Sequence, residues 1–269
     1  MNILENIFSW RVPSIDYNNG FSWFYFLFLI LTVIISLLII FKTKNHSDER
    51  VRWVVFGFGI LFLCLELFKQ LFHNVFDGWD GYDWNTFPFQ LCSTPLYFCL
   101  LSVLFPKNIR TKIYSYLTYV GFLGGIAVAL FPDTVSSDEV LMYADTLIWH
   151  NSMILLSIYL IVTQGFGNSL KETYPAMFCF LVVALMAMGM NYIFEICKQN
   201  DIVDGTFNMF MIRPYYDCNS PIISDILNMS NWYVVWMFYF GGVILGIITY
   251  WGIIHCILKL TRRKEMSEA

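Results

Sequence analysis

Seven apolar stretches, each long enough to cross a bilayer, constrain the fold of this chain more than any other feature. A membrane-spanning helix needs about 20 apolar residues. The stretches that meet this requirement are 21–42, 53–74, 88–105, 113–131, 141–163, 174–197 and 232–257. The longest connection between them is 198–231, which we expect to form an outer cap loop. The sequence therefore predicts an all-α membrane protein: seven transmembrane helices in a single transmembrane domain over residues 1–269.

Composition excludes the main soluble classes of protein. Of the 269 residues, 58% are hydrophobic and 13% are charged, about half the charged fraction of a soluble domain. A net charge of −4 without a basic block argues against nucleic acid as a partner. The seven cysteines form no Cys-x-x-Cys pair, so no zinc ribbon is expected. The first 20 residues lack the basic region of a signal peptide and contain Glu5 and Asp16.

The distribution of lysine and arginine predicts the orientation in the membrane. Basic residues are enriched in cytoplasmic loops. Twelve of the sixteen basic residues fall on one side of the predicted spans: Lys42, Lys44, Arg50, Arg52, Lys107, Arg110, Lys112, Lys171, Lys259, Arg262, Arg263 and Lys264. The opposite side holds Arg11, Lys198 and Arg213. We therefore expect a multi-pass protein of the cell membrane with its N-terminus outside and its C-terminus in the cytoplasm.

Polar residues within the predicted helices gather at one depth. The ionisable ones are Glu66, Lys69, His73, Asp145, His150, Glu195 and His255. At 1.5 Å per residue, all but His255 fall in the outer half of the bilayer, and Gln90, Cys92 and Asn191 join that layer. Charged groups in hydrocarbon are costly and usually functional. The layer therefore predicts an outward-facing site within the bundle.

Two helices in this layer allow alternative interpretations. Glu66, Lys69 and His73 share one face of their helix. They can form an internal Glu66–Lys69 ion pair or take a direct part in the site, and the spacing does not decide between these. Asp145 and His150 are about 140° apart around an ideal helix. We therefore expect them on different faces, with Asp145 near the membrane interface.

Cys92 has the surroundings expected of a reactive thiol. Pro88 fits the first turn of a helix, which places Cys92 near the positive end of the helix dipole, where thiolate is favoured. Pro95 cannot donate a hydrogen bond to the Leu91 carbonyl, so we expect a kink that lines a cavity. The histidines available as a base at this depth are His150 and His73. The alternative is that Cys92 is a small apolar packing residue.

Other residues give weaker signals. Small residues four apart allow close helix packing, and the pairs are Gly121 with Gly125 and Gly242 with Gly246. Cys197 and Cys218 both fall outside the membrane in this topology, and whether they pair stays open.

Short motifs between residues 85 and 240 resemble a known family. They are Pro-Phe-Gln-Leu-Cys at 88–92, Phe-Pro-Asp at 131–133, Trp-His-Asn-Ser at 149–152, Asn191, Asn-Met-Phe-Met at 208–211 with Pro214, Ser224-Asp225 and Trp232-Tyr233. In this order they are similar to the YwaF-type bacterial integral membrane proteins, which are related to the animal transmembrane protein 164 acyltransferases. The sequence departs from the family pattern at Gln90, where histidine is common.

The resemblance implies an enzyme that acts on lipid acyl chains. The cysteine that matches Cys92 takes the acyl group as a thioester, and the histidine that matches His150 supports it as base and acid. Asn191, Gln90 and Ser93 are candidates for orienting the imidazole or binding the oxyanion. Further polar residues expected in the pocket are Glu66, Lys69, His73, Asn208, Arg213 and Asp225. We expect Arg213 in the cap loop either to meet a lipid phosphate or to pack as an ordinary loop residue.

Three classes of function fit this pattern. The first is a lipid acyltransferase or transacylase with a membrane phospholipid as substrate, or a lipid esterase if water is the acceptor. The second is a non-catalytic transporter or small-molecule receptor that uses the same pocket. The third, a metal hydrolase using Glu66, His73 and His150, is disfavoured because the chain has no His-x-x-x-His pair. No cofactor and no metal are expected.

Overall fold

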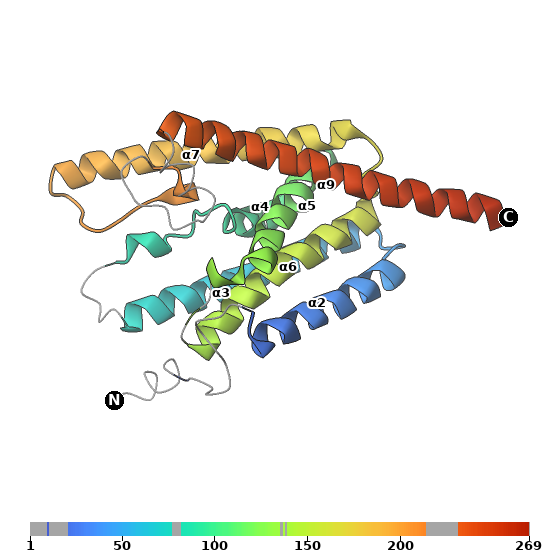
Figure 1. Ribbon diagram of the computed structural model, residues 1–269, viewed down its shortest axis with the longest axis horizontal. Coiled ribbons are helices and arrows are strands. Elements are labelled where there is room, and N and C mark those ends of the chain that lie inside the picture. Colours follow the sequence, from blue (N-terminus) through green and yellow to red (C-terminus); the bar gives the residue numbers. More distant parts are fainter. Residues whose placement is uncertain are drawn as a thin grey trace.

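The computed structural model describes residues 10, 21–76, 82–134, 137, 139–213 and 231–268. The regular elements in these residues are all helical, and six helices are long and apolar enough to cross a membrane (Figure 1). They are α2 (Trp23–Lys42), α3 (Asp48–Phe76), α5 (Lys107–Leu130), α6 (Val140–Gln164), α7 (Tyr174–Gln199) and α9 (Trp232–Glu268). The chain is therefore an all-α membrane protein, as its sequence predicts.

The stretch 88–105 differs from the continuous helix expected of it. It forms only the nine-residue helix α4 (Thr94–Ser102), preceded by turns and by the short 3-10 helix η1 (Trp84–Thr86). Pro95 lies in the first turn of α4, where its missing N–H costs nothing. The expected kink at Pro95 is therefore absent, because the helix begins at Thr94 instead of running through the proline.

Pairs of residues at the helix ends define two ends of the bundle. The start of α3 meets the start of α5 through an ion pair between Asp48 and Arg110. At the other end, Gln70 of α3 donates to the backbone oxygen of Thr86 at 2.8 Å. Residues 82–105 consequently connect the end where α3 stops with the end where α5 starts. This segment passes along the bundle as a helix would, although only part of it is helical.

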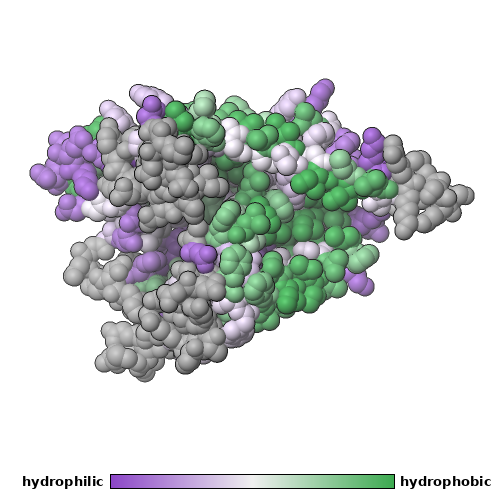
Figure 2. Space-filling model, in the orientation of Figure 1, coloured by the Kyte–Doolittle hydropathy of each residue, from purple (hydrophilic) through white to green (hydrophobic). Residues whose placement is uncertain are grey.

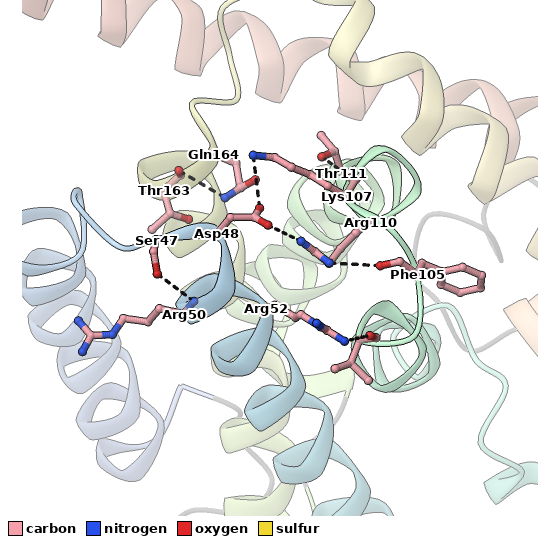
Figure 3. A network of polar contacts seen from close by, with 11 residues as sticks. Ser47, Asp48, Arg50, Arg52, Phe105, Lys107, Arg110, Thr111, Thr163 and Gln164 are labelled. Atoms are coloured by element: carbon pink, nitrogen blue, oxygen red, sulfur yellow. Dashed lines mark hydrogen bonds and ion pairs between the residues drawn. The ribbon is translucent and has the colours of Figure 1, made fainter.

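A buried arginine organises the end of the bundle where α3 and α5 begin (Figure 3). Arg110 is 6% exposed, pairs with Asp48, and donates through Nη1 to the backbone oxygen of Phe105 at 3.2 Å. Beside it, Arg52 donates to the backbone oxygen of Val103 at 2.5 Å. Two cations of the predicted cytoplasmic side thus fix the connection between α4 and α5.

Helices α5 and α6 pack closely and form the centre of the bundle. A Cβ atom on Gly125 would lie 2.7 Å from the backbone oxygen of His150, so only glycine permits this approach. A Cβ on Gly246 would lie 3.0 Å from the Leu123 side chain, whereas one on Gly121 or Gly242 would meet nothing within 4 Å. The prediction of close packing thus holds for one glycine of each pair.

The surface carries the polarity expected of a membrane protein. In Figure 2, apolar residues cover the middle of the face shown and hydrophilic residues gather towards its two ends. Helix α2 packs mainly on α6 and exposes large apolar side chains along its length, among them Ile30, Val33 and Leu38. Helix α9 continues to Glu268, beyond the expected 257, and extends past the other helices in Figure 1.

Candidate active site in the outer half of the bundle

Cys92 lies in the irregular segment before α4, two residues from the start of that helix. Non-helical backbone at membrane depth is tolerated only where protein groups satisfy its polar atoms. Tyr97 Oη donates to the Pro88 oxygen at 2.6 Å, and Thr94 Oγ1 donates to the Leu91 oxygen at 2.8 Å. Trp149 Nε1 donates to the oxygen of Cys92 itself at 2.9 Å. Side chains therefore replace the backbone hydrogen bonds that a continuous helix would have supplied.

A cavity of about 240 Å³ opens beside this segment. Its lining residues come from α3 (Leu65, Glu66 and Lys69), from the irregular segment (Gln90, Cys92 and Ser93) and from α6 (Asp145, Thr146, Trp149 and His150). Ser93 follows Cys92 directly in the chain, and both line this cavity. The structure thus brings Cys92 and His150 to one cavity, together with Glu66, Lys69, Gln90 and Ser93.

The hydrogen bond of His150 fixes its tautomer. His150 is 7% exposed, and its Nδ1 lies 2.9 Å from the backbone oxygen of Thr146. A carbonyl oxygen only accepts, so Nδ1 must carry the proton and donate it. Nε2 of the neutral ring then holds the lone pair. The imidazole is therefore oriented by its own helix, and Nε2 is the ring nitrogen that can act as a base.

The ion pair predicted on α3 is present and faces the cavity. Glu66 is 5% exposed and accepts from Lys69 Nζ at 2.8 Å and from Gln70 Nε2 at 2.7 Å. The internal ion pair is therefore confirmed, and a direct part of Lys69, which lines the cavity, stays a prediction. Its ammonium group is a fixed positive charge near the thiol.

Comparison with known proteins assigns the chain to a family. A model of the TMEM164 family matches residues 16–253, which include every long helix up to the middle of α9. The chain belongs to the TMEM164 family. No curated protein and no solved structure matches it.

The match to the TMEM164 family includes the whole cavity, but some expected site residues serve elsewhere. Asn191 donates to the Met209 oxygen at 3.0 Å and accepts from the Met209 nitrogen at 2.8 Å. Its amide is therefore committed to holding a loop, and Asn191 does not line the Cys92 cavity. The expectation that it orients the imidazole is wrong, because both halves of its amide bind backbone atoms 18 residues away.

Arg213 likewise lies away from the thiol. It is 2% exposed, pairs with Glu195 of α7, and donates to the Phe207 oxygen at 2.9 Å. Arg213, Glu195 and Asn191 line a second cavity of about 360 Å³, between α7 and the start of α9. Arg213 is therefore packed between its own loop and α7, and its contact with a lipid phosphate stays a prediction.

Gln90 connects the Cys92 segment to the 207–213 loop. Its Nε2 donates to the Asn208 oxygen at 3.0 Å, and its Oε1 accepts from the Phe210 nitrogen at 2.8 Å. The Asn208 side chain accepts from the Arg213 nitrogen at 2.9 Å. Phe210 and Met211 have φ of 60° and 55°, which non-glycine residues rarely adopt. The loop is held in this conformation by the amides of Gln90 and Asn191.

Of the remaining predicted residues, His73 does not line the cavity. His73 packs against Phe72, with ring centroids 5.6 Å apart near the end of α3, and is not among the lining residues. Asp225 falls outside the described residues. In the described parts of the chain, no three His, Cys, Asp or Glu side chains gather as metal ligands do.

Sequence reasoning missed Asp145, Thr146 and Trp149 as lining residues. The cavity is lined by one wide face of α6 that includes Asp145, Thr146, Trp149 and His150. Asp145 and His150 are about 140° apart around the helix, and this face includes both. Asp145 is buried, at 6% exposed, and lines the cavity, while its position near the membrane interface stays a prediction. The signal in the sequence was the spacing of four residues between Asp145 and Trp149 and between Thr146 and His150. Residues four apart are neighbours on the surface of a helix.

Proposed function

We propose that the protein is a membrane-embedded lipid acyltransferase that passes a fatty acyl group through a thioester on Cys92, with His150 as base and acid. Membership of the TMEM164 family supports the class of reaction. The observation that carries the proposal is the shared cavity of Cys92 and His150, with the imidazole hydrogen-bonded to Thr146 so that Nε2 is its basic nitrogen.

In the first half-reaction, Nε2 of His150 takes the proton of the Cys92 thiol as the sulfur attacks the carbonyl carbon of a phospholipid ester. The oxyanion that forms is stabilised by the Lys69 ammonium and the Ser93 hydroxyl. The intermediate expels the lysophospholipid oxygen, which takes the proton from Nε2. The products are a lysophospholipid and an acyl thioester on Cys92.

In the second half-reaction, His150 accepts the proton of an acceptor hydroxyl as that oxygen attacks the thioester carbonyl. The C–S bond breaks, and the sulfur recovers the proton from Nε2. A lysolipid acceptor makes the protein a transacylase, and water makes it a lipid esterase. A cavity at membrane depth suits this chemistry, because the substrate ester never has to leave the bilayer.

The proposal includes a location. We place the protein in the cell membrane with seven passages, six by long helices and one by residues 82–105, with the N-terminus outside. Contacts at the start of α3 and α5 support this arrangement, because they gather Arg52, Lys107 and Arg110 at one end. The cavity then lies towards the outer leaflet.

The test is mass spectrometry of the purified protein in nanodiscs of mixed phospholipids. We expect an acyl adduct on the Cys92 peptide that hydroxylamine removes and that is absent in Cys92→Ala and His150→Gln. Cys64→Ala, at an exposed cysteine of α3, is the matched control and keeps the adduct.

The absence of any adduct, with no turnover of labelled lipid, would contradict the proposal and favour binding or transport. An adduct that survives His150→Gln at an unchanged rate would exclude the proposed base. Adding a lysolipid or water-only buffer to the isolated thioester then identifies the acceptor.

A further inference from the structure

The carboxyl group of Asp145 lines the Cys92 cavity and has a buried oxygen without a hydrogen-bond partner among the described residues. Asp145 is 6% exposed and lines the cavity. Within the described residues, its Oδ1 has no hydrogen-bond partner. Buried polar groups in proteins are otherwise almost always hydrogen-bonded, and an exception needs an explanation. The proposed thioester chemistry uses Cys92, His150, Lys69 and Ser93 and leaves Asp145 without a role.

The charges of the cavity favour a ligand that donates a hydrogen bond to the Asp145 carboxyl group. Glu66 is already satisfied by Lys69 and Gln70. Asp145 makes no ion pair within 4 Å in the described residues, although it lines the same cavity as Lys69. An unpaired carboxyl group inside a membrane protein is costly. A hydrogen-bond donor from a bound molecule would remove that cost.

The position of Asp145 along α6 indicates which part of a lipid reaches it. Asp145 precedes His150 by five residues, which is about 7.5 Å towards the start of the helix. The ester must react at Cys92 and His150. The polar part of the same lipid then extends towards Asp145 and Lys69, since α6 starts at the end of the bundle where α3 stops.

We propose that Asp145 and Lys69 form a headgroup subsite, in which Lys69 contacts the lipid phosphate and Asp145 accepts a hydrogen bond from an O–H or N–H group of the headgroup. This inference rests on the proposed function and deepens it. Asp145 is then a specificity-determining residue that selects headgroups with a hydrogen-bond donor and discriminates against quaternary ammonium headgroups, which have none.

The experiment measures binding separately from chemistry. Native mass spectrometry of Cys92→Ala protein would compare lysophospholipids with the same acyl chain and ethanolamine, glycerol or choline headgroups. Ethanolamine and choline headgroups carry the same net charge but differ in N–H donors. We expect the ethanolamine lipid to bind about tenfold tighter than the choline lipid, as one charge-assisted hydrogen bond allows. Tight binding of the glycerol lipid as well identifies O–H as a sufficient donor.

Two variants distinguish recognition from a structural role. Asp145→Leu removes the carboxyl group without breaking a side-chain hydrogen bond within the described residues, so the folded protein should keep its thermal stability and lose the headgroup preference. Asp204→Asn, at an exposed aspartate outside both cavities, is the control and keeps the preference. Equal binding of ethanolamine and choline lipids, or a preference that survives Asp145→Leu, would overturn the subsite.

The outcome also separates the two proposals. A headgroup preference that depends on Asp145, without any acyl adduct on Cys92 in the parent protein, would keep the subsite and remove the acyltransferase function. An adduct on Cys92 that forms equally from all three headgroup classes would keep the function and remove the subsite.

Discussion

Trp149 Nε1 donates a hydrogen bond of 2.9 Å to the backbone oxygen of Cys92. The donor immediately precedes His150 on α6, so adjacent residues hold the backbone of Cys92 and supply the base of the proposed mechanism. Trp149 also packs on Phe62 of α3, with ring centroids 4.9 Å apart. One side chain therefore connects the three parts of the chain that line the cavity.

Trp149→Phe should reposition Cys92 without unfolding the protein. The phenyl ring retains much of the contact with Phe62 but leaves the Cys92 oxygen without its donor, at a cost of about 1 kcal/mol in the free energy of unfolding. We expect the rate of adduct formation on Cys92 to fall by about tenfold, measured by mass spectrometry in nanodiscs. Trp53→Phe, at an exposed tryptophan of α3, is the control. An unchanged rate would show that the hydrogen bond does not position the thiol.

Gly125→Ala should separate α5 from α6. Its Cβ would lie 2.7 Å from the His150 oxygen and 2.7 Å from Ile154 Cγ1, so the helices must move apart. We expect a loss of about 1–3 kcal/mol in stability, seen as a lower unfolding temperature in detergent, together with slower acylation. The same change at Gly121, where nothing lies within 4 Å, should be neutral or stabilising by up to about 1 kcal/mol. Equal effects at both glycines would contradict the packing argument.

Gln90→Leu should release the 207–213 loop. The variant loses the hydrogen bonds to Asn208 and Phe210, and the positive φ angles of the loop then have less to hold them. We expect faster amide hydrogen exchange across 207–213, measured by mass spectrometry. Gln164→Leu is the control, because the amide of Gln164 donates to Thr163 on its own helix, α6. If exchange rises equally in both variants, Gln90 does not restrain the loop.

Asp48→Ala should destabilise the end of the bundle drawn in Figure 3, because it leaves Arg110 buried without its carboxylate. Removing one partner of a fully buried pair costs about 3–5 kcal/mol. The side chain of Asp48 is 34% exposed, so we expect a smaller loss, about 2 kcal/mol. Arg50→Ala, at an exposed residue of the same helix, should stay within about 0.5 kcal/mol. Thermal unfolding of both variants in detergent would measure the difference.

The sequence by itself determined the helical class and the positions of six long helices. Runs of about 20 apolar residues can satisfy their backbone in lipid only as helices, so 21–42 and 174–197 agree with α2 and α7 to within two residues at each end. The motifs around Cys92 and His150 also led to the family and to two residues that share a cavity.

Only the tertiary structure decided how the 88–105 stretch is used. Its hydropathy is that of a spanning helix, but side chains of Trp149, Tyr97 and Thr94 satisfy its carbonyl groups. Tyr97 and Thr94 belong to the stretch itself, but Trp149 lies 57 residues from Cys92, and no local pattern records that contact. The irregular turn that presents Cys92 therefore depends on contacts between segments.

The same reason explains why Asp145 lines the Cys92 cavity and Asn191 does not. Both are polar residues at a similar depth, and their helical positions do not distinguish them. Asn191 faces the 207–213 loop, which offers it a backbone donor and acceptor, whereas Asp145 faces a cavity that offers Oδ1 no partner. Sequence periodicity gives the depth and face of a side chain, and the packing of distant segments decides which groups it meets.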